Sequence, residues 1–153
     1  MVLKVGDKAP QIDLKDQNGK PRRFKDLKSK ILILFFYPKD DTPGCTAEAC
    51  SFRDNYEAFK KLGVEIWGVS SDNNQSHINF TSKYKLPFTL ISDENNNLRK
   101  KFGVSNTLGV IPGRVTYIIS KEGIIIDIYK DLLNGPAHVI NALKIIKEHT
   151  KQL

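Results

Sequence analysis

Two cysteines, Cys45 and Cys50, are the residues of this sequence best suited to covalent chemistry. Cys45 directly follows Thr42-Pro43-Gly44, in which threonine suits a helix N-cap and proline suits the first helical position. A helix N-terminus directs unpaired backbone N–H groups and partial positive charge outward, and this favours thiolate over thiol. Cys45 is therefore a candidate nucleophile. On position alone, a small buried packing residue is an equally good interpretation, because free cysteines are usually inside.

A buried strand is expected directly before this helix. Residues 31–37 form a continuous apolar run between Lys30 and Pro38, which is typical of a central strand covered on both faces. Apolar residues then recur at three- and four-residue steps over 45–62, and Gly63 suits a helix end. We expect one helix of about five turns there. In open α/β sheets, reactive groups lie at the carboxyl ends of such strands.

The remaining patterns alternate strands with helices. The Asn18-Gly19 pair after Ile12 and Leu14 predicts an N-terminal β-hairpin. The fold class is therefore α/β with a sheet that contains parallel strands. Further strands are expected at 64–70, 87–91, 114–119 and 124–129, and further helices through 78–84, at 94–102 and from Pro136 onward.

Length and composition indicate one compact domain over residues 1–153, with 40% apolar and 27% charged residues. No apolar run approaches the roughly 20 residues that cross a bilayer, so no membrane partner is expected. Residues 1–7 lack the character of a secretory signal or a transit peptide, which predicts a cytoplasmic protein. A plastid protein whose transit peptide was removed is the alternative. Two cysteines are too few for a disulfide-stapled secreted scaffold.

The net charge of +7 raises the question of nucleic-acid binding, because six basic residues lie within residues 20–30. That segment has Phe24 as its single aromatic residue, and no zinc-finger, basic-zipper or RNA-recognition motif accompanies it. We expect a solvated basic face and no nucleic-acid partner.

Three histidines, His77, His138 and His149, lie far from the cysteines in sequence and lack metal-ligand spacing. Each is expected to be a surface or helix-face residue, and no metal is expected.

The segment from Pro38 to Cys50, PKDDTPGCTAEAC, resembles the active-site segment of the peroxiredoxins. Their signature is a proline, three residues, a threonine, two residues and the peroxidatic cysteine. The second cysteine five positions on resembles the subgroup known as bacterioferritin comigratory protein or peroxiredoxin Q. The resemblance extends over nearly the whole chain, including residues 5–10, 51–54, 83–93 and 112–117.

The resemblance implies a thioredoxin-like fold with a central mixed sheet flanked by helices and an N-terminal β-hairpin. It also implies a thiol peroxidase, in which Cys45 is oxidised by a peroxide to a sulfenic acid and Cys50 closes an intramolecular disulfide onto it. Hydrogen peroxide and organic hydroperoxides are both expected substrates. Thioredoxin or a similar dithiol protein would reduce the disulfide, no bound cofactor is needed, and a monomer is the simplest expectation.

The same resemblance assigns roles to Thr42, Pro38 and Arg114. The threonine hydroxyl would contact the peroxide or the thiolate, the proline would shield the pocket, and the arginine would supply a cation beside the sulfur. From the residues alone, each has a simpler interpretation. Thr42 suits an N-cap, Pro38 suits a strand end, and an arginine at the start of a strand is most often a surface charge.

The spacing of the cysteines predicts a conformational change. In an intact helix, residues five apart are displaced by about 7.5 Å along the axis and point about 140° apart. A disulfide requires Cα atoms closer than about 7 Å and facing side chains. The segment from Cys45 to Cys50 must therefore unwind when the disulfide forms, and Thr46 and Ala47 should lose amide-exchange protection.

Two other functions compete with the peroxidase. A thioredoxin-type dithiol oxidoreductase would share the fold, but its motif is Cys-x-x-Cys, whereas this chain has Cys-x4-Cys. A basic binding module would use residues 20–30 for an acidic partner, with the cysteines structural.

Overall fold

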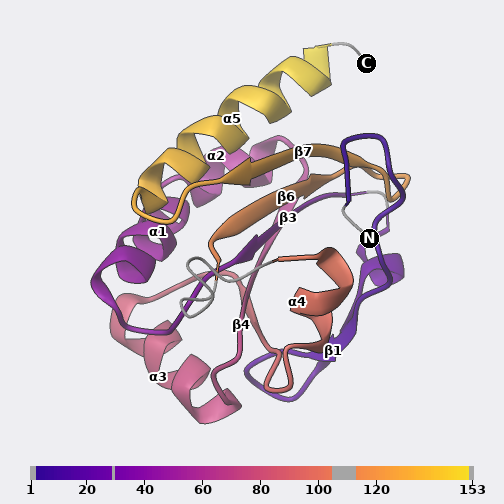
Figure 1. Ribbon diagram of the computed structural model, residues 1–153. Coiled ribbons are helices and arrows are strands. Elements are labelled where there is room, and N and C mark those ends of the chain that lie inside the picture. The colour runs from indigo at the N-terminus through magenta and orange to yellow at the C-terminus, as the bar shows by residue number, and fades with distance from the viewer. Residues whose placement is uncertain (1–2, 29, 105–112, 152–153) are drawn as a thin grey trace.

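The computed structural model, which describes residues 3–28, 30–104 and 113–151, is built on a five-stranded mixed sheet (Figure 1). Its strands are β3 (Ile31–Phe36), β4 (Val64–Ser70), β5 (Thr89–Ser92), β6 (Val115–Ile119) and β7 (Ile125–Lys130). The strand order is β5-β4-β3-β6-β7. β3 pairs in parallel with β4 and antiparallel with β6, so the expected mixed sheet and its central strand are confirmed.

Helices cover both faces of this sheet. They are α1 (Pro43–Asp54), α2 (Tyr56–Lys61), α3 (Asn74–Tyr84), α4 (Asn97–Phe102), α5 (Gly135–Lys151) and the short 3-10 helix η1 (Phe24–Leu27). Figure 1 shows α5 and α1 on one side of the sheet and α4 on the other. Successive strand side chains point to opposite faces, which explains why every residue of β3 is apolar and buried.

The two faces of β3 belong to two separate cores. Ile33 and Phe35 pack with side chains of α1, α2, α3 and α5, and this core includes Cys45. Leu34 and Phe36 pack with α4 and the N-terminal segment. Because both cores share one sheet, the arrangement supports a single domain over residues 1–153, which stays a prediction.

The expected N-terminal hairpin is confirmed. β1 (Asp13–Lys15) and β2 (Pro21–Arg23) pair antiparallel, and Gly19 takes a φ of +79° in the turn, a conformation that glycine adopts without strain. The Asp16 carboxylate accepts the N–H groups of Asn18 and Lys20 at 2.9 and 3.0 Å, which closes the loop.

The single long helix expected over residues 45–62 is wrong. The chain forms α1 and α2, separated at Asn55, whose backbone has φ −106° and ψ 8°. The Asn55 side-chain amide donates to the Ser51 carbonyl at 2.8 Å, and this bond satisfies a carbonyl at the end of α1. Apolar periodicity continues through the break, so it did not reveal the interruption.

The helix expected at 94–102 is shorter than predicted. Both oxygens of the Asp93 carboxylate accept backbone N–H groups, from Leu98 at 3.0 Å and from Arg99 at 2.9 Å. Asn96 has a left-handed φ of 57°. Asp93 therefore caps a helix that begins at Asn97, three residues later than the pattern suggested.

The basic segment is a solvent-facing surface, as expected. Lys20, Lys25 and Lys30 are exposed, while Arg22 forms an ion pair with Asp16 at 2.9 Å.

No helix in the described part of the chain combines the length and apolar character required to span a bilayer.

Candidate active site

Cys45 lies at the start of α1, directly beyond the carboxyl end of β3. Thr42 is the N-cap with extended backbone angles, and Pro43 occupies the first helical position. The Thr46 N–H donates to the Thr42 carbonyl at 2.8 Å, so the first turn is closed when the thiols are free. The Cys45 side chain is only 2% exposed, and the helix N-terminus places its partial positive charge beside the sulfur.

Arg114 supplies a cation to this sulfur. It directly precedes β6, and because β6 pairs with β3, its guanidinium lies at the same end of the sheet as Cys45. Nη2 donates to Cys45 Sγ at 3.3 Å, Nη1 donates to Glu48 Oε1 at 2.7 Å, and Nε donates to the Leu132 carbonyl at 3.0 Å. These three bonds fix the side chain, which is 5% exposed and is thus no surface charge.

Thr42 and Pro38 lie in the segment between β3 and the first turn of α1. Although Thr42 is the N-cap residue, its hydroxyl makes no capping bond and instead donates to the Lys39 carbonyl at 2.9 Å. Its oxygen keeps lone pairs that can accept a further hydrogen bond. Pro38 is half-buried just after the end of β3.

Cys50 is half-buried on the same helix and is a free thiol, like Cys45. Burial raises the pKa of the Cys50 thiol, an effect that the Arg53 charge opposes and the Asp54 charge reinforces. Cys50 is therefore predominantly protonated at neutral pH, which makes it a poor first nucleophile.

Three polar neighbours of the site were not among the predicted site residues: Glu48, His138 and Thr116. Glu48 and His138 are fully buried, and His138 Nδ1 lies 3.6 Å from Glu48 Oε2. His138 Nε2 faces the Asp131 carbonyl at 2.8 Å, so this nitrogen carries the proton and Nδ1 accepts from the Thr116 hydroxyl at 2.8 Å. Burial also lowers the pKa of His138, which keeps the ring neutral at neutral pH.

Glu48 shares Arg114 with Cys45. Burial raises the pKa of Glu48 to about 8, against the opposing effect of the Arg114 charge. Glu48 is therefore mostly protonated at neutral pH, and its Oε2 has no hydrogen-bond partner among the described residues. A neutral Glu48 leaves the guanidinium charge to the Cys45 sulfur.

One signal in the sequence points to Glu48. Cys45, Ala49 and Phe52 lie at helical spacing on the buried face of α1, and Glu48 interrupts this apolar set one turn after Cys45. A lone carboxylate on a buried face requires a cationic or hydrogen-bonding partner. Its partner Arg114 is 66 residues away, so local pattern could not identify it.

His77 and His138 lie on helices, which agrees with the helix-face half of the expectation, but their side chains are fully buried and not at the surface. His77 lies on α3 and contacts Asp40, while His138 lies on α5 beside the candidate site. His149 is half-buried near the end of α5. Within residues 3–28, 30–104 and 113–151, no three metal-ligating side chains converge on a point that could hold a metal ion.

Comparison with known proteins places this geometry in a family. The sequence pattern of the AhpC/TSA family matches residues 5–128. Peroxiredoxin Q of Arabidopsis thaliana, a chloroplastic protein, is 51% identical over 143 residues, which cover 93% of this chain and 66% of the relative. Chloroplastic peroxiredoxin Q of Sedum lineare is 46% identical over 93% of this chain and 77% of its own length. This chain belongs to the AhpC/TSA family, the peroxiredoxins.

Solved structures place this peroxiredoxin in the peroxiredoxin Q group and confirm its thioredoxin-like fold. A PrxQ mutant from Xylella fastidiosa matches with a TM-score of 0.90 and 28% identity, over 98% of this chain and 99% of that one. Peroxidoxin BcpB from Mycobacterium tuberculosis matches with a TM-score of 0.88 and 33% identity, over 95% and 97%. Bacterioferritin comigratory protein from Xanthomonas campestris, studied for alkyl peroxide reduction, matches with a TM-score of 0.82 and 31% identity, over 90% and 91%.

Family membership makes this peroxiredoxin a thiol peroxidase, as the sequence motif predicted. Its two cysteines fit the atypical two-cysteine type. The competing interpretations, a thioredoxin-type dithiol oxidoreductase and a basic binding module, gain no support from these relatives.

Proposed function

We propose that Cys45 is the peroxidatic nucleophile and that it reduces hydrogen peroxide and organic hydroperoxides. One observation carries this proposal: the buried Cys45 sulfur accepts a hydrogen bond from Arg114 at 3.3 Å at a helix N-terminus. Both features stabilise a thiolate. The relative studied for alkyl peroxide reduction supports the organic substrates.

The first step forms an S–O bond and breaks the peroxide O–O bond. The Cys45 thiolate attacks one peroxide oxygen, which yields a sulfenic acid and a hydroxide or alkoxide that takes up a proton to leave as water or alcohol. Arg114 stabilises the negative charge that develops on the two oxygens. Because the Thr42 proton is committed to the Lys39 carbonyl, the Thr42 oxygen would accept a hydrogen bond from the peroxide O–H. Pro38 would shield this pocket from water.

The second step joins the two cysteines. The Cys50 thiol, as its thiolate, attacks the Cys45 sulfenic sulfur, and the S–O bond breaks with release of water. α1 is continuous from Pro43 to Asp54 with both thiols free, so its first turns must open before the sulfurs can meet. Two electrons from an external dithiol then regenerate the thiols, and we assign this role to thioredoxin or a similar protein.

The assembly and the location are further parts of the proposal. A monomer suffices chemically, because both cysteines lie on one helix. The plastid location has the support of the two peroxiredoxin Q relatives from Arabidopsis thaliana and Sedum lineare, which are chloroplast proteins. The cytoplasmic location expected from the sequence stays a prediction. Size-exclusion chromatography and a fluorescent fusion in the source cell test the two points.

The decisive experiment measures intact mass and free thiols of the reduced protein before and after one equivalent of hydrogen peroxide. The parent should lose both thiols and two protons. Cys50→Ser should accumulate a trappable sulfenic acid, and Cys45→Ser should remain unchanged. If the parent retains both thiols after seconds of exposure, Cys45 is not an activated thiolate and the assigned roles are wrong.

A further inference from the structure

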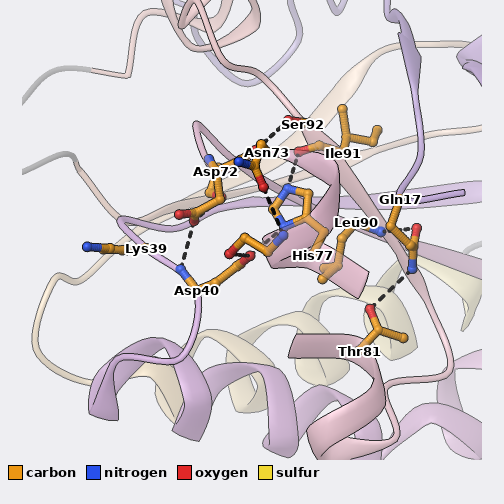
Figure 2. Close-up of polar contacts among 12 residues, drawn as sticks. Gln17, Lys39, Asp40, Asp72, Asn73, His77, Thr81, Leu90, Ile91 and Ser92 are labelled. Carbon is orange, nitrogen blue, oxygen red and sulfur yellow. Dashed lines mark hydrogen bonds and ion pairs between the residues drawn. The ribbon is translucent and has the colours of Figure 1, made fainter. Parts of the chain in front are cut away.

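A second buried polar cluster joins the loop before α1 to α3, and the peroxidase chemistry described so far does not use it. At its centre is Asp40, which is 7% exposed, and His77, which is fully buried. The Asp40 carboxylate accepts from the Tyr37 hydroxyl at 2.5 Å and from the Ser76 hydroxyl at 2.8 Å. His77 Nδ1 lies 2.7 Å from the same carboxylate (Figure 2).

The contacts of His77 fix the protons of this pair. Nε2 lies 3.1 Å from the Ile91 carbonyl oxygen, which only accepts, so Nε2 carries a hydrogen. Nδ1 faces a carboxylate oxygen, and a 2.7 Å contact between them requires a second proton. Whether that proton lies nearer the nitrogen or the oxygen, the pair is neutral overall. The His77 ring thereby links the Asp40 carboxylate on one side to the Ile91 carbonyl of β5 on the other (Figure 2).

The peptide group between Lys39 and Asp40 connects this cluster to the active site. Its N–H donates to the Asp72 carboxylate at 2.8 Å. Its carbonyl accepts the Thr42 hydroxyl at 2.9 Å. Asp72 is itself held by the Ser70 hydroxyl at 2.7 Å. The orientation of this one peptide plane therefore determines where the Thr42 oxygen lies relative to Cys45.

We propose that His77 is a positioning residue of the peroxidase: through Asp40 it holds the Lys39–Asp40 peptide in the orientation that aims the Thr42 oxygen at the peroxide. This inference rests on the proposed roles of Cys45 and Thr42. His77 touches neither the sulfur nor the substrate. It acts by holding the loop before α1 in a fixed position against α3. A displacement of about 1 Å in such a group lowers a rate by up to about 100-fold.

Two substitutions separate the two contacts of His77. An asparagine side chain can place its amide N–H₂ where Nδ1 lies and keep the bond to Asp40, whereas a glutamine can reach the position of Nε2 and keep the bond to Ile91. Each variant loses one buried hydrogen bond, so both should lose stability to a similar extent. His77→Asn keeps the Asp40 carboxylate fixed, whereas His77→Gln keeps only the bond to the Ile91 carbonyl. We therefore expect His77→Asn to retain the peroxide reactivity that His77→Gln loses.

The readouts are two second-order rate constants for reduced Cys45, one with hydrogen peroxide and one with iodoacetamide. Alkylation depends on thiolate and access but requires no alignment of the peroxide oxygens. We expect His77→Gln to lower the peroxide constant about 10- to 100-fold and the alkylation constant less than about twofold. His77→Asn should stay within about threefold of the parent for both reagents.

Tyr37→Phe gives a second arm if His77→Gln does not fold, because it removes one bond to the Asp40 carboxylate and leaves the ring in place. It should lower the peroxide constant selectively, by about 3- to 10-fold. Gln17→Ala is the matched control. Gln17 is a buried polar residue that bonds to Thr81, one helical turn after His77, and to Leu90 of β5 (Figure 2). Among the described residues, none of its hydrogen bonds reaches the loop before α1. It should lower stability and leave both rate constants unchanged.

Three results would overturn the inference. These are an unchanged peroxide constant in His77→Gln or Tyr37→Phe, an equal fall in His77→Asn and His77→Gln, or a proportional fall with both reagents. A failure of the proposed function would look different. In that case the parent protein itself would show no reaction of Cys45 with peroxide, before any variant at position 77 is compared.

Discussion

Arg114 donates to one oxygen of Glu48 at 2.7 Å, while the other oxygen of that carboxyl group has no hydrogen-bond partner among the described residues. The same guanidinium donates to the Cys45 sulfur. One cation thus serves two groups that can each become anionic. Because burial raises the pKa of Glu48 to about 8, Glu48 competes less with the sulfur for this charge below that pH than above it.

The protonation of Glu48 predicts a pH dependence of the peroxide reaction. Above pH of about 8, Glu48 ionises, and its carboxylate competes with the Cys45 sulfur for the positive charge of Arg114. It also adds a negative charge near the sulfur. The rate constant of Cys45 with peroxide should fall roughly tenfold once Glu48 is ionised, whereas Glu48→Gln should lack this fall. Stopped-flow measurement from pH 6 to about pH 10 covers this transition. Parallel profiles for the two proteins would show that Glu48 does not titrate in this range.

The same group predicts how stability changes with pH. Folding raises the pKa of Glu48 from 4.5 to about 8, so the unfolded state binds fewer protons between these values. The contribution of Glu48 to stability is therefore complete below pH 4.5 and is lost as the pH rises towards about 8. Glu48→Gln should remove this component of the slope. Urea unfolding of both proteins at several pH values measures the difference, and an unchanged slope would contradict the prediction.

Arg114 is expected to be the most sensitive position after Cys45. Arg114→Met should lower the peroxide rate constant about 10²- to 10³-fold, as loss of a fixed donor to a developing anion does elsewhere. Arg114→Lys keeps the charge but cannot reach Cys45, Glu48 and the Leu132 carbonyl at once, so it should recover only part of the rate. Full activity of the lysine variant would show that charge alone suffices.

Gly135 controls how closely α5 approaches the helix that carries Cys45. A Cβ atom at this position would lie 2.6 Å from the Glu48 Cβ and 2.9 Å from the Gly44 carbonyl oxygen. Gly135→Ala should therefore push the helices apart, lower the free energy of unfolding by about 1–3 kcal/mol and slow the peroxide reaction. Ile140→Ala, at an exposed position of α5, is the control and should alter neither quantity. A fully stable and active Gly135→Ala would contradict the close packing.

The sequence predicted those parts of the molecule that local patterns determine. The apolar run 31–37 identified the central strand, and Thr42-Pro43-Gly44 identified the helix start that presents Cys45. The break at Asn55 was missed because the apolar pattern continues through it, whereas the Asn55 backbone leaves the helical angles and its side chain turns back to the Ser51 carbonyl.

The polar partners of the site were missed for a different reason. Glu48 and Arg114 are 66 residues apart, and Asp40 and His77 are 37 residues apart. Each pair forms because separate strands and helices meet at one end of the sheet. Single-sequence periodicity reports which face is buried but not which distant side chain compensates a buried polar group. For that reason the burial of His77 and His138, expected as surface or helix-face residues, was not foreseen.

Disulfide formation should unfold the first turns of α1. With both thiols free, the Thr46 N–H donates to the Thr42 carbonyl at 2.8 Å, and Cys45 and Cys50 lie on one continuous helix. A disulfide between them is incompatible with that helix, so Thr46 and Ala47 should exchange their amide hydrogens much faster in the oxidised protein than in the reduced one. Peroxide-treated Cys50→Ser, which cannot close the disulfide, should retain the protection. Equal protection of Thr46 in the reduced protein and in the verified disulfide form would exclude helix unwinding as part of turnover.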